Sequence, residues 1–186
     1  VGVPLSVWKM DTTNDLAIFE AGISTTGEMQ LLASIIKPTM GVLTHMGPAH
    51  TEGFKGMPEK IKEKLQLFET VDTLIYGKDQ IQGYNLEGDA SVFKRPVTFY
   101  SWSRSVTATL VVTSEINKGS FTEMTVSYAS QNYTINIPFT DKASIDNAAL
   151  CMLTLLSLVK DFSYIIEGIR QLTAVDMRMQ LKKGIN

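Results

Sequence analysis

The stretch DLAIFEAGISTTGEMQLLASIIKPTMGVLTH (residues 15–45) contains the pattern that decides the predicted fold. A short apolar run at 15–22 is followed by apolar residues at helical spacing over 25–36, and Pro38 ends that helix. A second apolar run at 39–45 has the length and composition of a buried strand. Strand, helix and strand in this order predict a parallel sheet covered by helices.

The alternation continues toward the C-terminus. Residues 58–69 predict a helix with Pro at its start, and 72–77 predict another strand. From 96 to 139 the segments become short, alternating and β-branched, with turn residues between them, which predicts an antiparallel meander. Two further helices are predicted at 143–159 and 162–172. The predicted fold class is therefore α/β: a mostly parallel sheet flanked by helices, with a small antiparallel β subdomain.

The composition is that of a globular protein. The chain has 186 residues, of which 44% are hydrophobic and 19% charged, and this is enough for one domain with a core. A net charge of -2 gives no basic field for nucleic acid, and no apolar run is long enough to span a membrane. The single Cys151, predicted to be buried in an apolar helix, excludes an internal disulfide and fits a reducing compartment. Because the chain opens at VGVPLSVW without Met, we expect a piece of a larger protein.

Chemically useful side chains follow two of the predicted strands. Glu20 follows the first strand, and His45 and His50 follow the second. Ligands of such sheets bind at the carboxyl ends of the strands, where a carboxylate and an imidazole can hold a divalent ion. On these residues alone, two simpler interpretations stay open: Glu20 caps a loop, and His50 donates to a backbone carbonyl.

Lys64 lies beside the apolar stripe of the predicted helix at 58–69. A helical wheel makes it the most inward of three lysines there, with Lys60 and Lys62 nearer to water. It either extends its charged end to solvent along a buried stem, which the wheel favours, or it is held near a metal or phosphate. The phosphate-cradling sequence G-x-x-x-x-G-K-[ST] does not occur in the chain, so these residues supply no P-loop of their own.

Several linked patterns carry a resemblance to a known family. They are E-x-G at 20–22, G-E at 27–28, P-x-x-G-V-x-T at 38–44 and G-P-A-H-x-E at 47–52. With GVPLSVW and EKIKEKLQLF, they resemble the central ATPase domain of the Mur ligases, from residue 1 to about 68. The resemblance resumes at SIDNAALC and at MRMQLKKGIN. It is closest to the type that adds D-alanyl-D-alanine to the UDP-N-acetylmuramoyl tripeptide.

The resemblance implies roles for five residues. Glu20 matches a glutamate that binds a divalent ion beside the ATP phosphates, His50 matches a ligand of a second ion, and Lys64 matches a carbamylated lysine that helps to hold that ion. Asn147 matches an asparagine that contacts adenine, and Arg178 an arginine that approaches the phosphates. The resemblance thus assigns His50 and Lys64 to catalysis and reverses the solvent-facing interpretation of Lys64.

The same resemblance implies a cytoplasmic, ATP- and Mg²⁺-dependent ligase of peptidoglycan synthesis. Its substrates would be UDP-MurNAc-tripeptide and D-Ala-D-Ala, joined through an acyl phosphate. Residues 1–175 would be a partial central domain, and 176–186 the hinge to a third domain. The P-loop is expected upstream of Val1, so the isolated chain is expected to be inactive. The alternatives are another ligase of the superfamily, such as the folylpolyglutamate type, and a catalytically silent α/β binding module.

Two positions depart from the family pattern. His45 stands where the family usually has Asn, and we interpret it as a hydrogen-bonding residue at a strand end, not as an extra ligand. Ser144 replaces the first Asn of the N-x-x-N-A pattern that precedes the adenine-binding helix.

Overall fold

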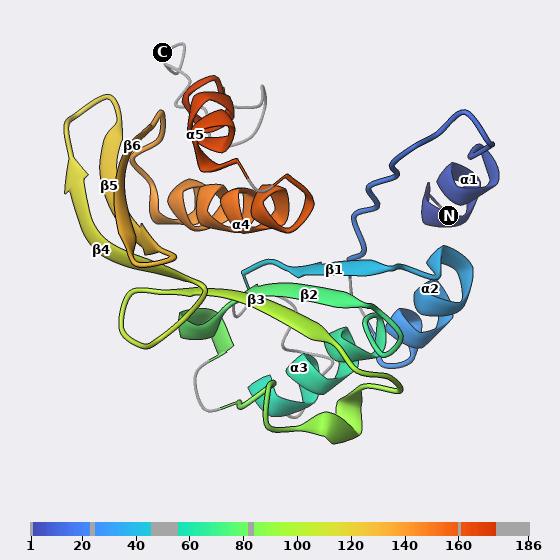
Figure 1. Ribbon diagram of the computed structural model, residues 1–186. Helices are drawn as coiled ribbons and strands as arrows, with labels where there is room; N and C mark the ends of the chain where they lie inside the picture. Colours follow the sequence, from blue (N-terminus) through green and yellow to red (C-terminus); the bar gives the residue numbers. More distant parts are fainter. Residues whose placement is uncertain (1, 23–24, 46–55, 82–83, 160, 174–186) are drawn as a thin grey trace, which may run out of the picture. The chain divides into compact units, whose positions relative to one another are not determined.

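The computed structural model describes residues 2–22, 25–45, 56–81, 84–159 and 161–173 (Figure 1). The helices are α1 (Gly2–Trp8), α2 (Glu28–Ile36), α3 (Met57–Gln66), α4 (Lys142–Leu158) and α5 (Phe162–Arg170), with short 3-10 turns η2 (Lys78–Ile81) and η3 (Ala90–Val92). The strands are β1 (Met40–Leu43), β2 (Thr73–Gly77), β3 (Thr98–Ser103), β4 (Leu110–Asn117), β5 (Thr122–Tyr128) and β6 (Gln131–Ile137). These strands follow one another in chain order across a single six-stranded sheet, which confirms the predicted α/β class. The chain divides into two compact units, Val1–Ser101 and Trp102–Asn186.

The first unit is built on a parallel strand pair. β1 and β2 pair in register from Met40 opposite Thr73 to Leu43 opposite Tyr76. Side chains from α2, α3 and both strands form one buried apolar cluster, which includes Met29, Leu43, Ile61, Leu65, Phe68, Leu74 and Tyr76. The predictions for 25–36, 39–45, 58–69 and 72–77 are confirmed, with ends that differ by a few residues.

The predicted strand at 15–22 is wrong. The segment is irregular, and its apolar side chains Leu16 and Ile18 are 66% and 87% exposed. Within the described ranges this segment pairs with no other strand. An apolar sequence becomes a strand only where a neighbour accepts its backbone hydrogen bonds, so composition alone was not sufficient here.

The second unit contains the predicted meander. β4, β5 and β6 pair antiparallel and form the curved ribbon in Figure 1. Gly119 has a left-handed φ of 91° and donates its amide to the Asn117 side chain at 2.7 Å, which closes the first turn. However, β3 pairs parallel with β4, so the antiparallel prediction was wrong for the first strand. After β3, the Ser103 Oγ accepts from the amides of Ser105 and Val106, both at 3.0 Å, which stabilises the turn that follows the strand.

Helices α4 and α5 begin at capping aspartates. Asp141 accepts from the Ser144 amide at 2.9 Å, and Asp161 accepts from the Ser163 amide at 2.9 Å. The expectation that Cys151 is buried is wrong, because the residue is exposed. It lies one helical turn after the exposed Asn147, on the side of α4 opposite to its buried residues. No helix in the described residues has the length and hydrophobicity required to cross a membrane.

An ionic cluster holds α4 against the start of the ribbon. The Arg104 guanidinium donates to Glu115 at 2.6 Å and to Asp146 at 2.7 Å, and it lies 4.8 Å from the centre of the Trp102 ring. The second carboxylate oxygen of Asp146 pairs with Lys142 at 3.3 Å. Only 3% of the Asp146 side chain is exposed, compared with 73% for Lys142. The two ion pairs of Asp146, with Arg104 and with Lys142, therefore differ in burial and should differ in their contribution to the free energy of unfolding.

We expect Asp146→Ala to lower the free energy of unfolding by about 1.5–3 kcal/mol, because it removes a charged hydrogen bond at a buried site. Lys142→Ala, which removes the exposed ion pair, should cost no more than about 0.5 kcal/mol. Urea unfolding of both variants measures the difference. If both variants lost the same free energy of unfolding, the stability could not be assigned to the Arg104–Asp146 ion pair.

A second expectation concerns Gly41 in β1. A Cβ at this position would lie 2.5 Å from Cδ1 of Phe68, whose ring is only 7% exposed and cannot retreat. Gly41→Ala should therefore destabilise the protein by about 1–3 kcal/mol through overpacking. Gly168→Ala is the matched control, since nothing lies within 4 Å of its added Cβ and alanine favours the helix. Thermal unfolding that ranks the two variants in the reverse order would refute this packing argument.

Candidate functional site

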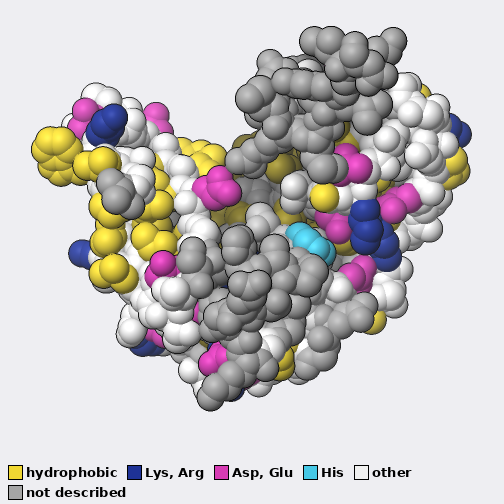
Figure 2. Space-filling model, turned by 180° about the vertical axis from the view of Figure 1, so that it is seen from behind, with side chains coloured by type: hydrophobic (Ala, Val, Ile, Leu, Met, Phe, Trp, Pro, Cys, Tyr) yellow, Lys and Arg dark blue, Asp and Glu magenta, His cyan; other side chains and the backbone are white. Residues whose placement is uncertain are grey.

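The candidate site is at the carboxyl edge of the β1–β2 pair. Because these strands are parallel, the residues after Leu43 and after Gly77 leave the sheet on the same side. His45 follows β1 by two residues, and its imidazole is exposed, as the cyan side chain in Figure 2 shows. Glu20 is exposed at the end of the irregular segment that precedes α2. His50 lies outside the described residues, so its predicted approach to Glu20 stays a prediction.

Lys64 lies on α3 and is half-buried. Burial lowers the pKa of its ammonium group, and the positive charge of Lys60 lowers that pKa further. The expectation that Lys64 is the most inward lysine of this helix is wrong, because Lys60 is only 4% exposed. The helical wheel took only the apolar stripe of α3 as the buried side. In the structure α3 also packs against α2 and η3, so a second side of the helix is buried. Lys62 is exposed, as expected.

Glu63 is the residue at this site that the sequence analysis missed. Its side chain is buried, with 2% exposure, although it lies between two lysines in the sequence. One carboxylate oxygen accepts from the backbone amides of Gly27 at 2.6 Å and Met29 at 3.4 Å. One feature of the sequence could have indicated this role of Glu63. The N-cap of α2 is Gly27, which has no side chain to accept hydrogen bonds from the first amides of the helix, so an acceptor from elsewhere is needed.

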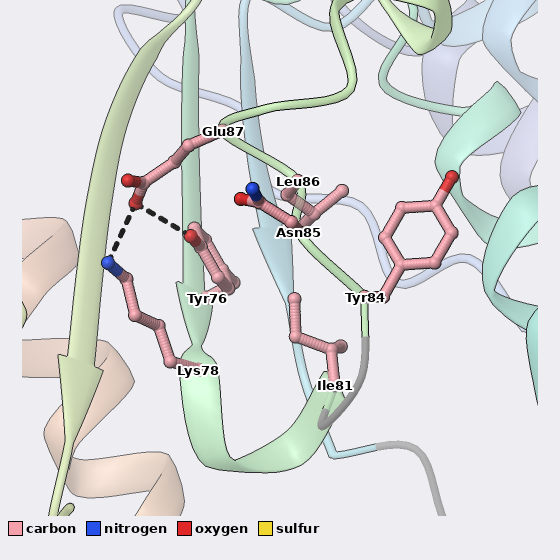
Figure 3. A pocket seen from close by; sticks show the side chains of 7 residues that line it. All are labelled: Tyr76, Lys78, Ile81, Tyr84, Asn85, Leu86 and Glu87. Atoms are coloured by element: carbon pink, nitrogen blue, oxygen red, sulfur yellow. Dashed lines mark hydrogen bonds and ion pairs between the residues drawn. The ribbon is translucent and has the colours of Figure 1, made fainter. Parts of the chain in front are cut away.

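A pocket of about 400 Å³ follows β2 in the same unit. It is lined by Tyr76, Lys78, Ile81, Tyr84, Asn85, Leu86 and Glu87 (Figure 3). Glu87 accepts from the Tyr76 hydroxyl at 2.8 Å and pairs with Lys78 at 3.1 Å. Burial by itself would raise the pKa of Glu87, but these two donors hold it below its usual value. The charged side chains Lys78 and Glu87 of the pocket thus pair with each other. The pocket includes none of the residues predicted to bind ligands.

The remaining predicted ligand residues lie elsewhere in the chain. Asn147 is exposed on α4, in the second unit. Arg178 and the proposed hinge at 176–186 lie outside the described residues. The described parts of the chain contain no group of three or more His, Cys, Asp or Glu residues that could hold a metal ion.

Comparison with known proteins identifies relatives of this chain. The family model described as Mur ligase middle domain matches residues 1–155. The UDP-N-acetylmuramoyl-tripeptide--D-alanyl-D-alanine ligase of Borreliella burgdorferi is 36% identical over 67 residues, which cover 36% of this chain and 14% of that enzyme.

Solved structures share the fold. A crystal structure of MurF from Acinetobacter baumannii matches with a TM-score of 0.81 at 17% identity, and the match covers 98% of this chain but 40% of that one. MurF ligase from Thermotoga maritima, solved in complex with ADP, matches with a TM-score of 0.69 at 16% identity, over 86% of this chain and 36% of that one. Since the family model covers most of the sequence, this chain belongs to the Mur ligase family, where it corresponds to the middle domain.

Proposed function

We propose that this chain is the ATP-handling part of a ligase that joins D-Ala-D-Ala to UDP-MurNAc-tripeptide in peptidoglycan synthesis. The match of the Mur ligase middle-domain model to residues 1–155 is the observation that carries the proposal. The half-buried position of Lys64 next to Lys60 on α3, which lowers the pKa of its amine, supports it, because the family resemblance expects a carbamate there. The substrate names come from the Borreliella burgdorferi relative, and the Thermotoga maritima relative supports ATP as the nucleotide because it was solved with ADP.

Formation of a carbamate requires a neutral amine. The nitrogen of Lys64 would attack the carbon of CO₂, a C–N bond would form, and the nitrogen would release a proton to water. A lowered pKa favours this reaction because it increases the fraction of unprotonated amine at neutral pH. The product is an anion in place of a cation, so the positive charge of Lys60 would attract it where it previously repelled the ammonium.

The donor set fits a hard divalent cation. Glu20 would hold one Mg²⁺ ion beside the phosphates, and His50 and the carbamate of Lys64 would hold a second ion; the carboxylate and the carbamate supply the oxygen ligands that Mg²⁺ prefers. The ions would supply positive charge next to the phosphate oxygens. We assign adenine contact to Asn147 and phosphate contact to Arg178, and we assign no ligand role to His45. The chain has no G-x-x-x-x-G-K-[ST] sequence, so ATP turnover would need residues outside these 186.

The reaction would have two steps, phosphorylation of the carboxylate and formation of the amide bond. A carboxylate oxygen of the tripeptide attacks the γ-phosphorus of ATP, the bond to the β–γ bridging oxygen breaks, and ADP leaves with that electron pair. The amine of D-Ala-D-Ala then attacks the acyl carbon, and phosphate leaves as the amine loses a proton. The role of the protein is to orient both reactants and to neutralise the crowded oxygens, which is the largest electrostatic need of such a transfer.

Substitution of Lys64 tests this proposal in the complete ligase. We expect Lys64→Ala to lower kcat by about 10²–10³, the scale for losing one preorganised electrostatic group. Lys64→Arg should not restore activity, because a guanidinium stays protonated and cannot form a carbamate. The measurement is phosphate release with ATP and both substrates present.

The matched control is Lys62→Ala, which removes an exposed lysine of the same helix and should leave the rate within about twofold. A short carboxylic acid should partly rescue Lys64→Ala by occupying the vacated position. Full activity of Lys64→Arg would eliminate the carbamate, and a wild-type protein that never ligates in an ATP-dependent manner would favour the silent binding module instead.

A further inference from the structure

The start of the first unit carries an exposed apolar surface, called here the N-terminal apolar surface. It consists of large hydrophobic side chains that are between 40% and 87% exposed and lie on α1, on the segment after it and on α2: Leu5, Trp8, Met10, Leu16, Ile18 and Leu31. Helices α1 and α2 contact each other, and Figure 2 shows hydrophobic side chains gathered over both. Trp8, at 83% exposure, presents by itself roughly 120–210 Å² of largely apolar area.

A surface of this kind is unusual for a protein that acts alone. Single exposed apolar residues are common, as Ile116 on β4 shows with 46% exposure. Contiguous apolar patches larger than a few hundred Å² are rare on monomers, and they mark sites of interaction. Trp8, Leu5 and Leu31 together bring the N-terminal apolar surface to that scale, so we expect a partner to cover it.

Helix α1 has little within the chain to stabilise it. It has seven residues, none of them buried, with no acidic residue in its first turn and no basic residue in its last turn. A helix this short is unstable in water by itself, because in proteins most helical stability comes from burial of an apolar face. The side chains that could supply this burial, Leu5 and Trp8, are 53% and 83% exposed. The stability of α1 and the exposed surface therefore call for the same partner.

The known relatives indicate where that partner comes from. The chain matches a middle domain, and it covers 40% of the MurF chain from Acinetobacter baumannii. More than half of such a protein thus lies outside the matched part. The exposed charged residues near the surface have both signs, with Lys9 close in sequence to Asp11 and Asp15, so they favour neither a strongly acidic nor a strongly basic partner. The chemistry of the surface fits a mainly apolar protein face.

We propose that the N-terminal apolar surface is an internal docking surface of the complete protein, covered by an apolar face from the part of that protein outside these 186 residues. The inference rests on membership of the Mur ligase family and on the exposure of α1 and its surroundings. It does not depend on the ligand roles assigned to Glu20, His50 and Lys64.

Hydroxyl-radical footprinting of the unmodified protein tests the inference, because methionine and tryptophan side chains are oxidised when they are exposed to water. In the 186-residue chain, oxidation should be fast at Trp8 and Met10 and slow at Trp102, which is fully buried. In the complete protein, Trp8 and Met10 should be oxidised at least about tenfold more slowly, since a covered side chain reacts only when its interface opens. Mass spectrometry of the peptides measures each residue separately.

Substitution of Trp8 gives a second measurement. Trp8→Gln should change the Tm of the 186-residue chain by no more than about 2 °C, because the side chain is exposed there. The same substitution should lower the Tm of the complete protein by about 4–8 °C, because it removes a large aromatic contact from the interface. Ile116→Thr is the matched control, since it removes a single exposed apolar side chain in the second unit and should change neither Tm by more than about 2 °C.

Each alternative occupant of the surface has its own result, and each would overturn the inference. Equal oxidation of Trp8 in the two proteins would show that nothing in the complete protein covers the surface. Slow oxidation in the 186-residue chain at every concentration would show that the chain covers the surface itself, and slow oxidation only at high concentration would identify a second copy as the occupant. An unchanged Tm of the complete protein in Trp8→Gln would also contradict the inference. Lys64→Ala tests the proposed function alone, so the two proposals can fail separately.

Discussion

The close contact between Phe68 and Gly41 is the constraint on which the site-bearing unit depends. The ring occupies the space that any Cβ of residue 41 would need, with Cδ1 only 2.5 Å from that point. The chain leaving α3 therefore packs directly on the backbone of β1, and both belong to the cluster that contains Leu65 and Leu74. This packing fixes where α3 runs, and with it the place of Lys64 beside the parallel pair.

Charge distribution on α3 follows from its packing on two sides. Lys60 and Glu63 are buried at 4% and 2% exposure, while Lys64 is half-buried and Lys62 exposed. A buried ion needs a partner or a function, and Glu63 has its partners in the amides of α2. Lys60 acts on its neighbour by lowering the pKa of Lys64. The helix thus combines a structural carboxylate with an amine whose protonation is weakened, one residue apart.

The sequence predicted helices α2 to α5, the β1–β2 pair and the β4–β6 meander because their apolar periodicity and turn residues are local signals, but it did not predict α1. It could not predict that 15–22 remains irregular, since a strand requires a partner that no local pattern specifies. The burial of Lys60 and Glu63 was missed for a related reason: a wheel drawn on α3 alone cannot include the N-terminus of α2. Lys64 and Glu20 were recognised through family resemblance, whereas the chemistry of their surroundings came from the fold.

Carbon-13 NMR with labelled bicarbonate tests most directly whether Lys64 carries a carbamate in the complete ligase. Wild-type protein should show a protein-bound carbamate signal that is absent from Lys64→Ala and present in Lys62→Ala. The signal should weaken at acidic pH, because protonation of the amine competes with its reaction with CO₂. A wild-type spectrum without any carbamate signal, or one whose signal persists in Lys64→Ala, would contradict the account.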